Sequence, residues 1–262
     1  MFVNLPLSWI ARDKRWFRLF IERRINPEFG MDTVAVQDLP ESWHRETAAM
    51  LRAEGLACGV HLPFFDLHPG SFNDAILAAS RETLRRAAAL ASLYAPHHMI
   101  GHVSWDGSQH GADAARWLER SVGTWGGVLG VSEATLCLEN THERSPEHLR
   151  RVVDALPVER AGICFDVGHW FSFAGGIARD DLDRWLDAFA PRLSHLHLHD
   201  NDGSGDQHLG LGAGRIPLAA FFEGLERRGV KPSATLEPHD EVAFEQSLAW
   251  MRARPEVMTL LG

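Results

Sequence analysis

Nine histidine, aspartate and glutamate residues recur along the chain in a pattern typical of a metal centre. Two short motifs, Asp166-Val-Gly-His169 and Asp206-Gln-His208, supply four of them. Each motif alone is weak evidence, because a lone histidine is usually structural and a lone carboxylate often caps a helix. The complete set is His61, His102, Glu139, Asp166, His169, His197, Asp206, His208 and Glu237.

Ligands of this kind and number indicate several metal ions. One zinc ion uses about four ligands, so nine ligands imply two or three ions. Mixed imidazole and carboxylate ligation suits zinc best, with manganese or iron as alternatives. Clustered divalent ions activate water, neutralise a phosphoryl group and stabilise a leaving oxygen, so such a cluster suits phosphodiester hydrolysis.

The elements that must position these residues follow a regular rhythm. Short apolar runs alternate with longer amphipathic stretches eight times, at intervals of about 33 residues, as in βα units. This alternation favours an α/β fold, namely a (β/α)8 TIM barrel that forms one domain over residues 1–262. A barrel with seven strands and an open doubly wound sheet are the alternatives. The predicted strands are Phe2–Leu7, Thr33–Val36, Leu56–His61, His97–His102, Ala134–Glu139, Gly162–Asp166, Leu193–Leu198 and Ala234–Glu237. Helices are expected over Asn73–Leu93 and Asp113–Trp125, and from Ser145-Pro146-Glu147, where serine can cap.

A parallel barrel brings these residues to one place. The carboxyl ends of its strands converge at one mouth, and most predicted strands from the third onward end on a potential ligand. Residues two positions earlier also point inward. They are Gly59, Ile100, Cys137, Cys164, His195 and Thr235. The two cysteines are therefore interpreted as core residues, whereas His195 and His199, on the face of His197, are expected to orient a metal ligand.

These motifs carry a family resemblance. Over the third to eighth predicted strands, the chain resembles the endonuclease IV branch of the xylose isomerase-like barrels, with all nine ligand positions of the three-zinc site filled. The resemblance implies that His61 and His102 hold one metal, which Glu139 bridges to a second. It further implies that Asp166, His197 and Glu237 complete the second metal, and that His169, Asp206 and His208 hold a third. Glu139, Asp166 and Glu237 are expected to take part in catalysis.

Three substrate classes fit such a site. The first is a large small molecule with one phosphodiester, and the second is abasic DNA, cut by an endonuclease. The third is a sugar, because isomerases and epimerases of related barrels need only Glu139, Asp166, His197 and Glu237; that function leaves the other five residues without a role.

Aromatic residues in the predicted mouth loops favour the first class. Those expected to contact substrate are Trp9, Phe64, Phe65, Trp105, Trp170 and Phe171, and Phe173 lies in the same loops. The opening Phe2-Val-Asn-Leu-Pro-Leu7 and the segment His61-Leu-Pro-Phe-Phe-Asp-Leu67 are similar to the cobamide-remodelling phosphodiesterases. That resemblance implies a cobamide substrate, cut in its nucleotide loop.

Composition and charge limit the class of protein, its partners and its location. The chain has 262 residues, of which 45% are hydrophobic, and a formal net charge of −9. The acidic balance argues against a nucleic-acid partner, since phosphate binding usually leaves a basic footprint. No stretch approaches the roughly 20 apolar residues of a membrane span, and no signal peptide is evident at the N-terminus. Three scattered cysteines suit a reducing compartment, so a cytoplasmic location is expected.

Overall fold

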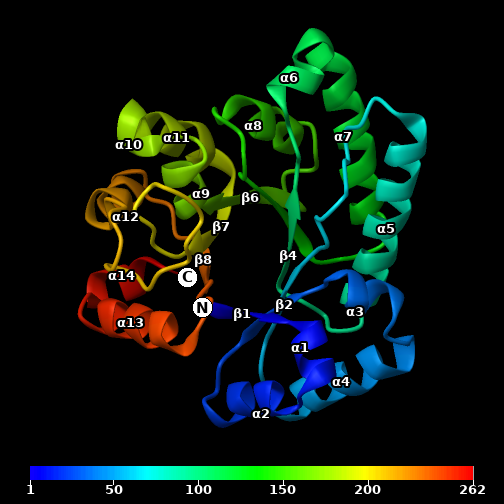
Figure 1. Ribbon diagram of the computed structural model, residues 1–262, viewed down its shortest axis with the longest axis vertical. Coiled ribbons are helices and arrows are strands. Elements are labelled where there is room, and N and C mark those ends of the chain that lie inside the picture. Colours follow the sequence, from blue (N-terminus) through cyan, green and yellow to red (C-terminus); the bar gives the residue numbers. More distant parts are fainter. Residues whose placement is uncertain (262) are drawn as a thin grey trace.

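Parallel strands form a closed barrel at the centre of the molecule (Figure 1). The structure, a computed structural model, describes residues 1–261, and within them each strand pairs with the next while β1 pairs with β8. The strands are β1 (Phe2–Pro6), β2 (Pro27–Gly30), β3 (Gly59–His61), β4 (His98–His102), β5 (Thr135–Glu139), β6 (Ala161–Asp166), β7 (Leu193–Leu198) and β8 (Ser233–Leu236). The predicted single-domain (β/α)8 barrel is confirmed at the level of the fold.

Helices surround the strands and alternate with them along the chain (Figure 1). The first half contains α1 (Leu7–Arg12), α2 (Arg15–Glu22), α3 (Thr33–Gln37), α4 (Glu41–Ala53), α5 (Asp74–Ser92), α6 (Gly107–His110) and α7 (Ala114–Leu129). The second half contains α8 (Glu147–Asp154), α9 (Val167–Ser172), α10 (Gly176–Arg179), α11 (Leu182–Phe189), α12 (Leu218–Arg227), α13 (Glu241–Arg252) and α14 (Pro255–Leu260). Two 3-10 turns cover Gly111–Asp113 and Ala190–Arg192.

The second strand is not where the sequence pattern predicted it. Thr33–Val36 lies in the short helix α3, and β2 occupies Pro27–Gly30 instead. The side chain of Asp32 accepts a hydrogen bond from the Ala35 backbone N–H at 2.9 Å, which caps the helix. The β-branched residues of this segment were thus misleading, because local capping overrides their strand preference.

The other expected elements overlap the observed ones, although β3 begins three residues later than expected and α7 ends four residues later. Strand β7 has the predicted bounds, and α5 begins after Asn73, whose side chain accepts from the backbone N–H groups of Ala75 and Ile76. Helix α8 begins after Pro146 without a side-chain cap, so the expected serine cap does not form. Strand β1 ends one residue early, because Leu7 opens α1.

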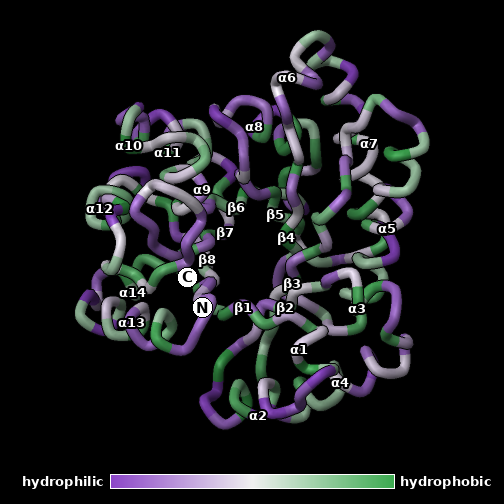
Figure 2. The backbone as a smooth tube through the Cα atoms, viewed as in Figure 1, coloured by the Kyte–Doolittle hydropathy of each residue, from purple (hydrophilic) through white to green (hydrophobic). Residues whose placement is uncertain are grey.

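The main core lies between the strands and the helices. Helix α5 buries its apolar face, which includes Leu77, Leu84 and Ala88. Figure 2 shows hydrophobic and hydrophilic residues alternating along the outer helices, as expected for elements with one face toward solvent. Within residues 1–261 no helix is long and apolar enough to cross a membrane.

The interior of the barrel differs from the main core, because it contains polar and ionisable residues as well as apolar ones. Ile100, Cys137 and Cys164 form a small apolar cluster, as predicted for inward-facing residues. Burial raises the pKa of the Cys137 thiol to about 12, so the thiol stays protonated and behaves as an apolar group. Toward the β2 side the interior contains Glu28, His98 and His195, all buried.

Candidate metal centre

The nine potential ligands converge at the carboxyl ends of the strands. His61, His102, Glu139 and Asp166 are the final residues of β3 to β6. The other five lie in or directly after β7 and β8, in α9, and in the loop that follows β7. All nine are connected through side-chain contacts of 3.0 to 4.0 Å between ring nitrogens and carboxylate oxygens.

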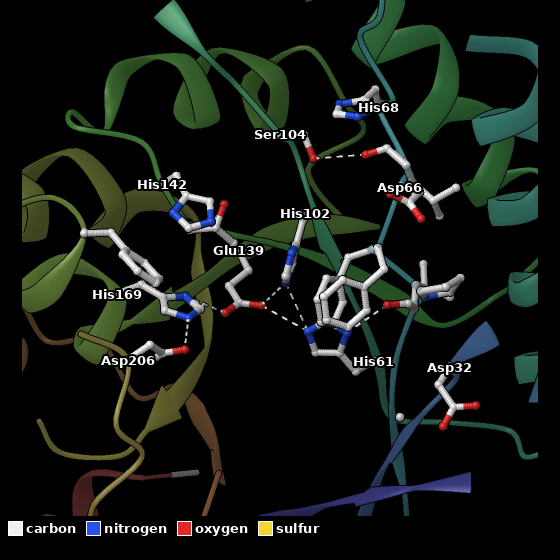
Figure 3. Close-up of a pocket in the computed structure, with 18 of the residues that line it drawn as sticks. Asp32, His61, Asp66, His68, His102, Ser104, Glu139, His142, His169 and Asp206 are labelled. Atoms are coloured by element: carbon white, nitrogen blue, oxygen red, sulfur yellow. Dashed lines mark hydrogen bonds and ion pairs between the residues drawn. The ribbon is translucent and has the colours of Figure 1, made fainter. Parts of the chain in front are cut away.

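Glu139 lies between two groups of histidines (Figure 3). Its Oε2 atom is 3.2 Å from His61 Nε2 and 3.0 Å from His102 Nε2. Its Oε1 atom is 3.2 Å from His169 Nδ1 and 3.3 Å from His197 Nδ1. Burial would raise the pKa of Glu139, but the facing imidazoles of His197 and His102 outweigh that effect and hold the pKa well below its ordinary value. The carboxylate is therefore ionised, and its two oxygens face opposite sides of the site.

A second group of ligand atoms surrounds His197. Its Nδ1 atom lies 3.3 Å from Glu139 Oε1, 3.4 Å from Glu237 Oε1 and 4.0 Å from Asp166 Oδ2. Ligands held about 2.1 Å from a tetrahedral ion lie about 3.4 Å from one another, so most of these separations suit a shared ion. Asp166 has a second task, since its Oδ1 atom accepts the backbone N–H of His169 at 2.6 Å and caps α9.

The third group lies at the loop after β7. Asp206 Oδ2 is 3.1 Å from His208 Nε2 and 3.4 Å from His169 Nε2. His199, from the end of β7, joins the group, because its Nε2 atom is 3.5 Å from Asp206 Oδ1. Ligand atoms of His169, His199, Asp206 and His208 all lie within 4.8 Å of one another.

Backbone carbonyl groups fix the orientation of three ligand histidines. Nδ1 of His61 lies 2.8 Å from the Leu62 oxygen, and Nδ1 of His208 lies 2.7 Å from the Glu237 oxygen. Nδ1 of His169 lies 3.0 Å from the Asn140 oxygen. A carbonyl oxygen only accepts, so each Nδ1 carries the proton and donates it. In the neutral ring, Nε2 is then left with a lone pair that faces the site, as in metal-binding histidines.

Several buried polar atoms lack a hydrogen-bond partner among the described residues. They include Asp166 Oδ2, Asp206 Oδ1 and both ring nitrogens of His197 and His199. A buried polar atom without a partner is costly, so such atoms need an explanation. Divalent cations provide one, because they bind carboxylate oxygens and neutral imidazole nitrogens. The residues present therefore fit a cluster of metal ions.

Glu28 is a site residue that the sequence pattern did not reveal. It lies on β2, and its Oε1 atom is 3.0 Å from His197 Nε2, although the two groups are not aligned as a hydrogen bond. Its Oε2 atom accepts from the Thr235 hydroxyl at 2.6 Å and lies 2.7 Å from His98 Nε2. A carboxylate on Nε2 favours a proton there, which leaves His197 Nδ1 for the ligand cluster.

His195 lies one layer below the ligands. Its Nε2 and Nδ1 atoms are 2.8 Å from Thr235 Oγ1 and 2.7 Å from Ser233 Oγ. Burial lowers the pKa of His195 to about 3, so the ring is neutral. This position is compatible with the predicted role of orienting a ligand. His199 differs from that prediction, because it lies among the ligand atoms themselves.

A cleft of about 1250 Å³ opens above the ligand cluster. Phe64 covers one ligand, with its ring stacked on His102 at 4.4 Å. Phe65 is 76% exposed, which leaves its ring free for a ligand. The aromatic residues that line the cleft are Trp9, Phe64, Phe65, Trp105 and Phe173.

Trp170 and Phe171 do not belong to this rim. Both are buried in the main hydrophobic core, and neither lines the cleft. The Trp170 ring N–H donates to Asp181 at 3.0 Å. The two residues lie on α9, which starts directly after Asp166, and this helix buries both side chains. The expectation that they contact substrate is corrected accordingly.

The charge of the cleft is acidic. Among the described residues that line it, Arg144 is the sole arginine and no lysine is present. The acidic lining residues are Glu28, Asp32, Asp66, Asp106, Glu139, Asp206 and Glu237. Such a lining attracts cations, and it provides few partners for an extended polyanion.

Sequence similarity identifies the family. Residues 26–254 match the xylose isomerase-like TIM barrel family. The chain belongs to this family. An uncharacterized protein of Methanocaldococcus jannaschii, MJ1311, is 27% identical over 187 residues. The alignment covers 68% of this chain and 63% of that relative, so the chain spans less than two thirds of its relative's length.

Solved structures with this family fold superpose over almost the whole chain. A D-tagatose 3-epimerase-like protein has a TM-score of 0.79 at 19% identity, and the match covers 99% of this chain and 98% of that one. A Thermus thermophilus protein, TTHB071, solved after soaking with ZnCl2, has a TM-score of 0.75 at 24% identity over 96% of each chain. D-psicose 3-epimerase of Clostridium cellulolyticum has a TM-score of 0.73 at 15% identity, covering 98% of this chain and 99% of that one. At these identities the likeness shows the fold alone.

Proposed function

We propose that this protein is a metal-dependent hydrolase that cuts a phosphodiester in a large small-molecule substrate. The substrate class that we infer is a cobamide, cut in its nucleotide loop. The observation that carries the proposal is the position of Glu139, whose Oε2 faces His61 and His102 while its Oε1 faces Nδ1 of His197. A carboxylate in that position can bridge two cations, as a multinuclear phosphodiesterase requires.

The chain's own residues would divide the work in the following way. His61 and His102 would hold one ion, and Asp166, His197 and Glu237 a second, with Glu139 shared between them. His169, Asp206 and His208 would hold a third. Bound divalent ions supply an activated water and neutralise the phosphoryl charge. Zinc is the first candidate for a site of this composition, with manganese or iron as alternatives.

The cleft favours a substrate larger than a simple sugar. Its volume of about 1250 Å³ exceeds the roughly 300–1,000 Å³ of a typical small-molecule pocket. Exposed rings on its rim, Trp9, Phe64 and Phe65, offer apolar surface that a flat macrocycle can cover. A cobamide combines such a macrocycle with a single phosphodiester, which would reach the ligand cluster below.

The test combines metal analysis with a hydrolysis screen. Purified protein should contain two or three divalent ions per chain, and it should release the nucleotide-loop products from a cobamide. A chain without metal, or a loaded protein that leaves every phosphodiester substrate intact, would refute the proposal.

An endonuclease of abasic DNA is the first alternative, because the sequence resembles the endonuclease IV branch. The affinity of such an endonuclease for DNA should fall steeply as the salt concentration rises, since neutralised phosphates release counterions. Cobamide binding through apolar surface should change little with salt. Titration of an abasic duplex and of a cobamide at low and moderate salt separates the two. Tight, salt-sensitive DNA binding with strand cleavage would favour the endonuclease.

A sugar epimerase is the second alternative, favoured by the epimerase-like folds among the solved structures. That reaction would use Glu139, Asp166, His197 and Glu237 around a single ion. It would not need His61 or His102, so a double His61→Ala/His102→Ala variant should keep epimerase activity and lose phosphodiesterase activity. Ketohexose epimerisation by the double variant would favour the epimerase.

A further inference from the structure

We infer that His199 is a fourth protein ligand of the group formed by His169, Asp206 and His208, and that it closes this site to further ligands. The inference rests on the proposed metal cluster and concerns one of its ions. Nothing in the family resemblance assigns a metal to His199. The site has three imidazoles and one carboxylate of its own, whereas the first site has three ligands and the second shares Glu139 with the first.

The burial and orientation of His199 carry the argument. The residue is 1% exposed, and neither of its ring nitrogens has a hydrogen-bond partner among the described residues. Its Nε2 atom lies 3.5 Å from Asp206 Oδ1 and 3.3 Å from Asp166 Oδ1. A buried imidazole with two unsatisfied nitrogens would be destabilising, unless one nitrogen binds an ion.

The neighbouring backbone accommodates this ring specifically. The Cα of Gly168 lies so close that a Cβ on this residue would overlap Cε1, Nε2 and Nδ1 of His199. The glycine in Asp166-Val-Gly-His169 thus provides the room in which the His199 ring lies. On its other side, the ring stacks on His208 at 3.9 Å with an interplanar angle of 9°.

His208 is itself held at a conformational cost. It is a non-glycine residue with a φ of 50°, in the left-handed region. Such a backbone costs on the order of 1 kcal/mol and persists where the surroundings enforce it. Here the conformation brings Nε2 to Asp206 while Nδ1 donates to the Glu237 carbonyl. One ligand atom from each of these two rings, from Asp206 and from His169 thus lies within 4.8 Å of the other three.

Four protein ligands have a defined consequence for zinc. Structural zinc sites are closed by four protein ligands, whereas catalytic sites keep one position for water or substrate. His61, His102 and Glu139 provide three ligands and leave the first site open. The second site reaches four ligands only through Glu139, which it shares with the first, so it loses a ligand that the His199 site does not depend on. The ion bound by His199 is therefore retained as a structural ion, and hydrolysis takes place at the other two metal sites.

The test measures how fast each zinc ion leaves the protein. Wild-type protein loaded with zinc and mixed with a chromophoric chelator should release one ion per chain slowly and the remainder fast. His199→Asn should lose the slow phase, with release at least about 10-fold faster, since even residues behind the ligands alter metal affinity by 10- to 100-fold. His239→Ala is the matched control, because His239 stacks on His208 at 4.0 Å without belonging to the ligand group.

A measurement on the wild type keeps the test decisive if the variant fails to fold. X-ray absorption of protein that holds only the retained zinc should count three imidazoles on that ion. Two imidazoles, or a slow phase unchanged in His199→Asn, would overturn the inference and leave the metal cluster intact. A wild-type protein that binds no zinc would refute the cluster itself.

Discussion

At the scale of single residues, Glu139 is the side chain on which the proposed chemistry depends most. Glu139→Gln keeps the shape but removes the negative charge and one metal-binding oxygen between the two histidine groups. We expect hydrolysis to be abolished and metal content to fall below that of the wild type. The exposed Glu133→Gln, whose side chain is 98% exposed, is the control and should behave as wild type. Near-normal turnover of Glu139→Gln with full metal content would contradict a bridging role.

His197 and His195 provide a matched pair on one face of β7. His197→Ala should lose metal, because its Nδ1 atom lies within reach of Glu139 and Glu237. His195→Ala should weaken metal affinity by about 10- to 100-fold without abolishing binding, as changes behind a ligand do. Calorimetric zinc titration of both variants shows which substitution lowers the zinc affinity more. Equal losses would show that His195 is a ligand or that both changes disturb the barrel.

At the scale of elements, most of the candidate site could be located from the sequence, because the proposed ligands coincide with strand ends. A short apolar run that ends on a histidine or a carboxylate can be recognised in the sequence as a strand that ends at the site. Strands β3 to β6 are of this kind, and they end on His61, His102, Glu139 and Asp166. Strand β2 carries no such signal, since Gly30 ends it and Glu28 lies in its middle. Loop aromatics were equally ambiguous, because sequence alone does not distinguish the buried Trp170 from the exposed Phe65.

Strand β2 nevertheless reaches the centre through Glu28. Glu28→Gln should lower metal affinity by about 10- to 100-fold, because an amide holds His197 Nε2 less firmly than a carboxylate. Asp32→Ala, four residues on, removes the cap of α3 instead. It should cost about 1 kcal/mol of stability with unchanged metal content. Zinc titration and thermal unfolding of both variants separate the two effects, and unchanged affinity in Glu28→Gln would refute the positioning role.

At the scale of the whole molecule, metal binding should stabilise the barrel. The ligands come from six strands or their loops, so an ion joins distant parts of the chain that the unfolded state keeps apart. An ion at 100 times its dissociation constant contributes about 2.7 kcal/mol. For a chain of this size, that corresponds to a rise in melting temperature of about 5 °C or more. Thermal unfolding is measured once in the presence of a chelator and once after zinc has been restored. Identical melting curves for the two samples would contradict a metal cluster.

The closure of β1 on β8 also has a consequence for biosynthesis. Strand β8 pairs with β1, and Glu237 follows it, so the ligand set is complete only when the last βα unit has been made. At roughly 5–20 residues per second, about 10 to 35 s separate the synthesis of His61 from that of Glu237. During that interval the early histidines have left the ribosome without the carboxylates that complete their sites. The finished chain, and not the nascent one, therefore selects which metal it keeps.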